Sequence, residues 1–200
     1  MSKRVTLLGD SIRIGYQATV KEQLADVAEV WSPEGNGMHS VHHLCNMGWY
    51  LDQPADLIHF NFGLWDCRRL GRVRTDNLVP LETYLRNLDY LLEVVRGGTS
   101  AKLIWATITP LVQERYGATH AKGWSPWRVN EDIVRFNEAA APVLARHGVQ
   151  INDLGALVHQ HGPASMICED GVHYTPEGSA VLGTRVASVI REALAGSPGV

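Results

Sequence analysis

Apolar residues gather along the chain in short runs that alternate with longer segments of helical periodicity. The runs are rich in Val, Ile, Leu and aromatic residues with little polar alternation, as expected for strands covered on both faces. They predict strands at 3–8, 27–31, 56–62, 102–108 and 149–152. Between and after them, helices are predicted at 16–26, 41–51, 81–95, 132–146, 153–159 and 176–194.

Residues that typically begin or end helices support several of these boundaries. Gly97-Gly98 is expected to end the third helix, Asp153 to cap the fifth, and Pro176 to occupy the first turn of the last. The segments 63–80 and 111–128 lack a regular period and are expected to be long loops, which in compact domains tend to carry function.

The alternation of strands and helices predicts an α/β fold. We expect a three-layer α/β/α sandwich with a central, mostly parallel five-stranded sheet, formed by residues 1–200 as a single domain. Ligands bind such sheets at the carboxyl ends of the strands, so the loops that follow the strands are the places to look for chemistry.

Composition excludes several classes of function. The 200 residues are 45% hydrophobic and 20% charged, with a formal net charge of −3, so no basic field favours nucleic acid. No apolar stretch predicts a signal peptide or a membrane span, and we expect a cytoplasmic protein without membrane or nucleic-acid partners. Three widely spaced cysteines suggest thiols that are buried or incidental, rather than a disulfide framework.

Metal binding is not favoured by the histidines. His39, His42 and His43 fall on or next to a predicted helix without the spacing of a known zinc motif, so neither a metal nor another cofactor is expected.

Ser11 is the first candidate for catalysis. It follows the first predicted strand in Gly9-Asp10-Ser11, where its hydroxyl could face the crevice beside free N–H groups of a helix start. The alternative is that Ser11 caps the helix, a common role for serine at such a position.

Asp170 and His173 form the second candidate. They are three residues apart around Gly171, so one short turn lets the carboxylate accept from one imidazole nitrogen while the other takes a serine proton. Taken alone, an Asp-x-x-His tetrad is a weak signal.

Together, these blocks resemble the SGNH, or GDSL-type, serine hydrolases over essentially the whole chain. That family has Gly-Asp-Ser after the first strand, a glycine after the second, Gly-x-Asn-Asp after the third and Asp-x-x-His before the last helix. The resemblance implies the flavodoxin-like fold of that family and a triad of Ser11 as nucleophile, His173 as base and Asp170 as the residue that orients it.

The resemblance also implies an oxyanion hole, and here the sequence departs from the family. Backbone N–H groups of Ser11 and of Gly37, or of Met38 if the alignment shifts by one, would be two donors. The third block reads Gly63-Leu64-Trp65-Asp66, so Trp65 stands where the family has an amide donor. Trp65 either donates through its indole N–H or forms a wall against the substrate. Asn61, inside the strand, is not expected to replace the amide.

Other polar and aromatic residues are expected at the same sheet edge. Trp124 and Trp127 resemble stacking platforms for a sugar, although loop tryptophans also serve packing. The substrate-binding candidates are Asp10, Asp66, Trp124, Trp127 and Arg128, with Arg13, Arg68, Arg69, Thr107, Thr109 and Asn130 nearby.

The sequence therefore predicts a serine esterase for small acyl esters, with acetyl esters of carbohydrates as the leading substrates. An acyl thioesterase or lysophospholipase is an alternative within the same chemistry. A binding module that kept the fold without catalysis is the alternative from another class.

Overall fold

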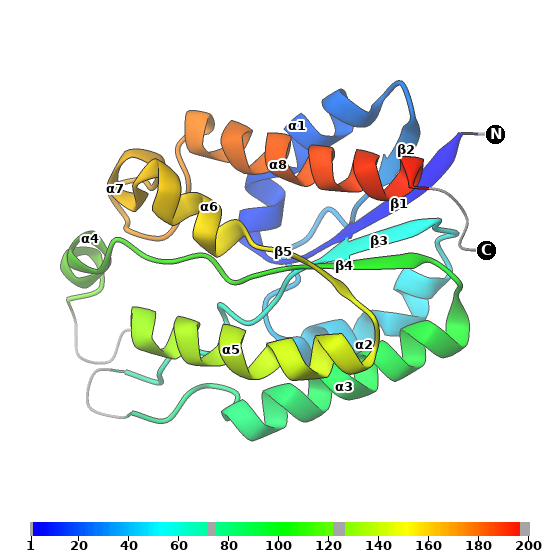
Figure 1. The fold of residues 1–200 in the computed structure, drawn as a ribbon. Coiled ribbons are helices and arrows are strands. Elements are labelled where there is room, and N and C mark those ends of the chain that lie inside the picture. Colours follow the sequence, from blue (N-terminus) through cyan, green and yellow to red (C-terminus); the bar gives the residue numbers. More distant parts are fainter. Residues whose placement is uncertain (1, 72–74, 122–126, 197–200) are drawn as a thin grey trace.

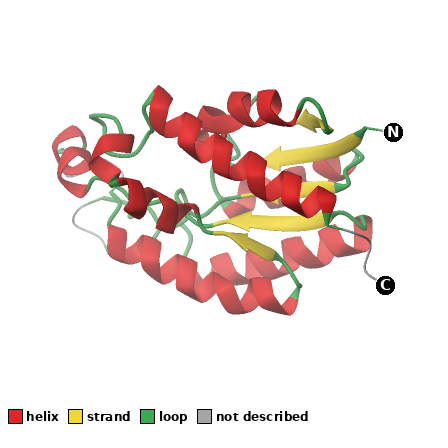
Figure 2. Cartoon of the chain, turned by 45° about the horizontal axis from the view of Figure 1, so that its top comes forward, coloured by secondary structure: helices red, strands yellow, loops and turns green. Residues whose placement is uncertain are grey.

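A parallel sheet of five strands organises the chain. The computed structural model describes residues 2–71, 75–121 and 127–196. The strands are β1 (Lys3–Leu8), β2 (Ala28–Trp31), β3 (Leu57–Phe60), β4 (Lys102–Ala106) and β5 (Gln150–Asn152). Their spatial order is β2-β1-β3-β4-β5, and every neighbouring pair is parallel (Figure 2). The predicted five-stranded parallel sheet is confirmed.

Helices cover both faces of this sheet and complete the predicted three-layer sandwich. They are α1 (Ser11–Leu24), α2 (Ser40–Leu51), α3 (Leu81–Gly98), α4 (Gln113–Thr119), α5 (Asn130–Arg146), α6 (Leu154–His161), α7 (Pro163–Met166) and α8 (Pro176–Ala195). Figure 1 shows α1 and α8 on one face and α2, α3 and α5 on the other. The short helices α4, α6 and α7 lie at the end of the molecule toward which the strands point (Figure 1).

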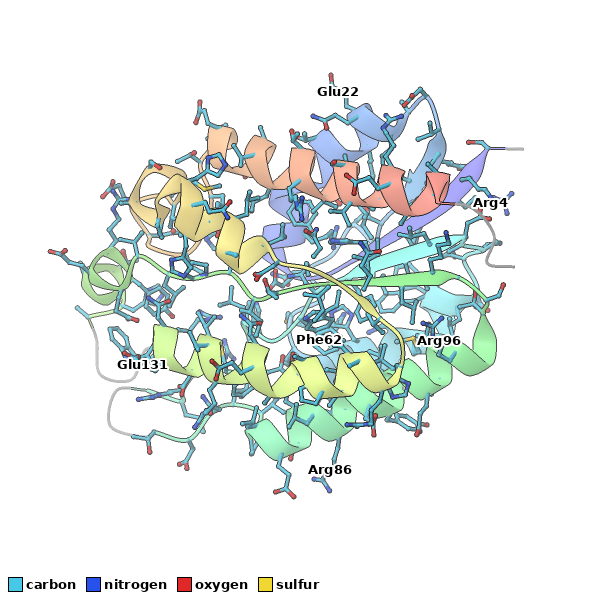
Figure 3. All side chains as sticks on the ribbon, viewed as in Figure 1. Arg4, Glu22, Phe62, Arg86, Arg96 and Glu131 are labelled. Carbon is cyan, nitrogen blue, oxygen red and sulfur yellow. The ribbon has the colours of Figure 1, made fainter. Side chains whose placement is uncertain are left out.

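The strands are buried because each carries apolar residues on both of its faces. Leu7, Leu57 and Trp105 are at most 1% exposed, and the aromatic rings of Phe60 and Phe62 pack edge-on against Trp105. In Figure 3 the side chain of Phe62 lies inside the molecule, between the sheet and the helices below it. This two-sided core explains why the strands read as continuous apolar runs.

Helix α1 begins five residues earlier than the sequence suggests. Gly15 weakens the local helix signal, but a side chain at Gly15 would approach the Ser179 hydroxyl to 3.3 Å. A side chain at Gly183 would collide with Thr19. The small residues let α1 and α8 pack closely, and this tertiary contact outweighs propensity.

The loop predicted at 111–128 contains the short helix α4, which is a correction to the sequence analysis. Seven residues with a glycine among them give little periodicity, and no side chain caps the helix start. The fully buried Tyr116 anchors α4 to the core. Helix α7, of four residues, was also not predicted, whereas Asp153 caps α6 as expected by accepting from the N–H of Ala156.

Two further features bear on the earlier expectations. No helix within 2–71, 75–121 and 127–196 is long and apolar enough to cross a membrane. Cys45, Cys67 and Cys168 are all free thiols; Cys67 is buried and Cys45 is exposed.

Candidate active site

Ser11 is the first residue of α1, directly after β1. The helix cap is Asp10, whose Oδ1 accepts from the N–H of Ile12 at 2.9 Å, so the alternative that Ser11 itself caps the helix is wrong. As a first-turn residue Ser11 has no acceptor for its N–H within the helix. This N–H is therefore free to act at the carboxyl edge of the sheet, and the hydroxyl is not used to cap the helix.

The turn between α7 and α8 brings Asp170 and His173 to Ser11. Nε2 of His173 lies 3.0 Å from Oγ of Ser11, and Nδ1 lies 2.6 Å from Oδ2 of Asp170. The other carboxylate oxygen accepts from the N–H groups of Val172 and His173, each at 2.9 Å. Partial burial by itself would raise the pKa of Asp170, but these backbone bonds and the His173 ring together hold it below its ordinary value.

Neighbouring backbone fixes the shape of this turn. The carbonyl of Gly171 accepts from the N–H of Val112, and the carbonyl of His173 accepts from the N–H of Cys168 at 2.7 Å. Gly171 has φ +78°, and a side chain there would collide with the backbone of Tyr116 in α4. The turn needs glycine for both reasons.

Asp10 and Asp66, two predicted substrate contacts, have no exposed surface. Burial raises the pKa of Asp10, opposed by the Ile12 N–H and by the charge of Arg128. Asp66 accepts hydrogen bonds from both the N–H and the hydroxyl of Ser40, and so ties the third block to the start of α2. Both carboxyl groups are buried beside the site and bond to the protein, so they have no surface with which to contact a substrate.

Neither Gly37 nor Met38, in the loop after β2, offers the free backbone N–H that was expected for the oxyanion hole. The N–H of Gly37 donates to the carbonyl of Gly9 at 3.0 Å, and the N–H of Met38 donates to Oδ1 of Asn36 at 2.8 Å. Buried Arg13 holds the preceding loop by donating to the carbonyls of Pro33 and Gly35. In this conformation the loop is a support of the Gly9-Asp10-Ser11 turn rather than a source of oxyanion donors.

A pocket of about 350 Å³ opens beside Ser11 and His173. Trp65 lines it, with the guanidinium carbon of Arg68 4.6 Å and that of Arg128 5.6 Å from the centre of its ring. The other lining residues are Leu64, Thr119, His120, Asp170 and Val172. Trp65 therefore lines the same pocket as Ser11 and His173.

The aromatic loop contributes less to the pocket than the sequence suggested. Trp127 does not line it; its backbone pairs with Arg69, and its ring lies 5.6 Å from that of Tyr116, which favours the packing interpretation. Trp124 lies outside the described residues. Arg128 does reach the pocket, and it is held there by bonds to the Leu64 carbonyl at 2.7 Å and the Tyr116 hydroxyl at 2.9 Å.

The remaining polar candidates have structural partners. Arg69 pairs with Asp132 at 2.8 Å, Thr107 donates to Asp153, and Asn130 bonds both backbone groups of Leu111. Asn61 is buried against Gly9, whose added side chain would collide with the amide of Asn61, so Asn61 does not reach the pocket.

The histidines of α2 form no metal centre. His43 is buried against Phe62, and burial lowers its pKa to about 3, which keeps the ring neutral. In the described part of the chain no three His, Cys, Asp or Glu side chains gather in a way that could hold a metal ion.

Sequence reasoning missed Thr119 and His120 as pocket residues. They stand at the end of α4, whose existence the sequence did not reveal. The sequence carried one signal of this helix, the four-residue spacing of Tyr116 and His120, which is about one helical turn. In the structure the centres of their rings lie 4.1 Å apart in a stacked arrangement.

The chain is similar in sequence to two proteins named as esterases. A GDSL esterase/lipase of Arabidopsis thaliana is 24% identical over 96% of this chain and 87% of its own length. An isoamyl acetate-hydrolyzing esterase 1 homolog of Homo sapiens is 24% identical over 98% of this chain and 84% of its own. No family model matches the chain.

Several solved hydrolase structures share the fold of this chain. A lipase/acylhydrolase of Enterococcus faecalis superposes with a TM-score of 0.78 at 20% identity, covering 98% of this chain and all of that one. The acetyl xylan esterase AlAXEase gives 0.71 at 16% identity over 94% of this chain and 99% of its own. The SGNH hydrolase fold and the resemblance to GDSL-type hydrolases, both expected from the sequence, are confirmed.

Proposed function

We propose that this chain, an ester hydrolase of SGNH fold, cleaves small acyl esters, acetyl esters first among them, through Ser11, His173 and Asp170. The observation that carries the proposal is the unbroken line of contacts from Ser11 Oγ through both nitrogens of His173 to the Asp170 carboxylate. The names of the relatives support a carboxylic ester hydrolase as the broader class.

In the proposed reaction, His173 accepts the proton of Ser11 as its Oγ attacks the ester carbonyl carbon. The tetrahedral intermediate collapses when His173 returns that proton to the leaving alcohol, which leaves an acyl group on Ser11. Water, deprotonated by His173, then attacks the acyl carbonyl and releases the acid. Asp170 holds the imidazole in the tautomer that this sequence requires and stabilises its charged form.

The oxyanion would be held by the N–H of Ser11 and the indole N–H of Trp65. The Gly37 and Met38 N–H groups already donate within the protein, so Trp65 is the remaining one of the predicted donors. One such donor contributes about 3 to 4 kcal/mol to the transition state.

The pocket supports a short acyl group and a polar alcohol. Its volume of about 350 Å³ and its lining by Thr119, His120 and two arginines do not suit a long alkyl chain. The more apolar groove, lined among others by Ile133, Val134 and Ile151, does not include Ser11. A carbohydrate is the proposed alcohol, supported by Thr119 and His120, which could bond hydroxyl groups, and by the similarity to an acetyl xylan esterase.

A covalent label tests the reaction type. Incubation with a fluorophosphonate, followed by peptide mass spectrometry, should place the adduct on Ser11. Ser11→Ala should remove both the label and the turnover of 4-nitrophenyl acetate while keeping the thermal unfolding midpoint, because Asp10 and not Ser11 caps α1. A folded protein that takes no label on Ser11 refutes the esterase and leaves the binding-module alternative.

A further inference from the structure

Two guanidinium groups face the pocket from different parts of the chain. Arg68 follows the third block, whereas Arg128 precedes α5, and both lie within 6 Å of the centre of the Trp65 ring. The same pocket is lined by Ser11 and His173. Two positive charges therefore lie close to the bond that would be cleaved.

Within the described residues neither guanidinium is hydrogen-bonded to a carboxylate or forms an ion pair with one, although the charge of Arg128 acts on the buried Asp10 carboxyl. Arg128 donates to two uncharged oxygens, the Leu64 carbonyl and the Tyr116 hydroxyl. Arg68 makes no hydrogen bond or ion pair with any side chain of the described segments. Asp170 is the one acidic side chain among the described lining residues, and it is engaged by His173.

This arrangement contrasts with the arginine next in sequence. Arg69 is paired with buried Asp132 at 2.8 Å, and Arg135 contacts the same carboxylate at 3.0 Å. Burial lowers the pKa of Arg68, and the nearby charge of Arg128 lowers it further. The fold thus neutralises Arg69 and leaves the two pocket arginines repelling each other, a cost that a bound anion would offset.

We propose that Arg68 and Arg128 form an anion subsite, and that the natural ester carries a carboxylate or a similar negative group on its acyl or alcohol part. The proposal rests on the esterase function proposed above and specifies its substrate class. A guanidinium presents paired N–H donors that match a carboxylate, and Arg128 is already held in place by its two bonds. The Trp65 ring, over which both guanidinium groups lie, holds them at the same side of the pocket.

Pairs of esters that differ chiefly in a negative charge measure how strongly the proposed subsite favours an anionic substrate. On the alcohol side, 4-acetoxybenzoate is compared with its methyl ester. On the acyl side, the mono-4-nitrophenyl ester of adipate is compared with 4-nitrophenyl hexanoate. The variants are Arg68→Gln and Arg68→Lys, with Arg86→Gln as control because Arg86 is exposed on the outer surface of α3, where Figure 3 shows it directed away from the molecule. Arg68 is chosen over Arg128 because it makes no structural hydrogen bond.

In at least one pair, Arg68→Gln should lower the ratio of kcat/KM for the anionic ester to that for the neutral ester by roughly 10- to 100-fold. Arg68→Lys should keep part of the preference, and Arg86→Gln should keep all of it. Raising the salt concentration should shrink the wild-type preference, since charges near solvent are screened.

An equal loss on both members of each pair would overturn the proposal and assign Arg68 to the oxyanion or to folding. Unchanged ratios in both pairs would also overturn it, while Ser11-dependent turnover of the neutral esters would leave the esterase function standing. If no ester is hydrolysed, the esterase proposal fails by itself. Calorimetric titration of 4-acetoxybenzoate into Ser11→Ala, and into Ser11→Ala combined with Arg68→Gln, then decides the subsite; equal affinities would refute it.

Discussion

Asp66 should make the stability of this protein fall as the pH rises from about 4 to about 6. The carboxyl group has no exposed surface, and burial raises its pKa to about 6 although Ser40 donates two hydrogen bonds to it. In the unfolded chain the pKa returns to 3.8. A difference of about two pKa units corresponds to about 3 kcal/mol.

The sign follows from which state binds the proton more tightly. Below pH 3.8 the carboxyl is protonated in both states, and its burial carries no charge penalty. Above pH 6 it is ionised in both states, and the folded state then holds a buried charge. Asp66→Asn retains an oxygen acceptor for Ser40 but cannot titrate. Its free energy of unfolding should therefore not show the decrease with rising pH that Asp66 causes in the wild type.

Urea unfolding of both proteins at pH 4, 5, 6 and 7, followed by tryptophan fluorescence, measures the difference. The free energy of unfolding of Asp66→Asn, minus that of the wild type, should rise by about 2 kcal/mol between pH 4 and pH 7, because the carboxyl of the unfolded chain is already partly ionised at pH 4. Asp52→Asn, at an exposed carboxyl after α2, is the control. A difference that stays flat or falls with pH would refute the raised pKa of Asp66.

Three substitutions test other parts of the site. Asp170→Asn should lower kcat for 4-nitrophenyl acetate by about 10³- to 10⁴-fold with the fold intact. The amide oxygen would stay on the two backbone N–H groups of the turn, so the NH₂ group would face Nδ1 of His173 in place of an acceptor; a loss below tenfold would contradict the orienting role. Gly171→Ala should cost roughly 2 to 4 kcal/mol in thermal unfolding because φ is +78° and the added carbon meets Tyr116, whereas Gly97→Ala, in open space, should be neutral or stabilising. Arg13→Met should cost about 3 kcal/mol by leaving buried carbonyls without donors, and an unchanged unfolding midpoint would show that water replaces the guanidinium.

The sheet and its order of elements could be predicted from the sequence because both depend on strong local patterns. Continuous apolar runs mark the strands, and Asp153 and Pro176 mark two helix starts through side-chain capping and proline geometry. Boundaries that depend on tertiary contact were less predictable. The start of α1 is an example: Asp10 caps it, but Gly15 weakens the helical pattern that follows, and the packing of Gly15 against α8 appears only in the structure.

For the candidate site, the sequence indicated which side chains meet but not which backbone groups remain free. Ser11, Asp170 and His173 come together as their strand-end and helix-start positions implied. Whether the N–H of Gly37 is available depends on a bond to the Gly9 carbonyl, and no residue type encodes that choice. The unpaired state of Arg68 is likewise a property of its surroundings rather than of its identity.

Helix α4 and the turn that carries His173 are held together through Gly171, whose carbonyl receives the Val112 N–H and whose Cα packs on Tyr116. Thr119 and His120, at the end of the same helix, line the pocket. Any insertion or deletion in this segment that reshapes the pocket would therefore also displace the imidazole from Ser11. Evolution of new substrate preferences, in nature or in directed evolution, is restricted here to side-chain replacement at constant loop length, and Thr119 and His120 are the positions where such replacements should accumulate first.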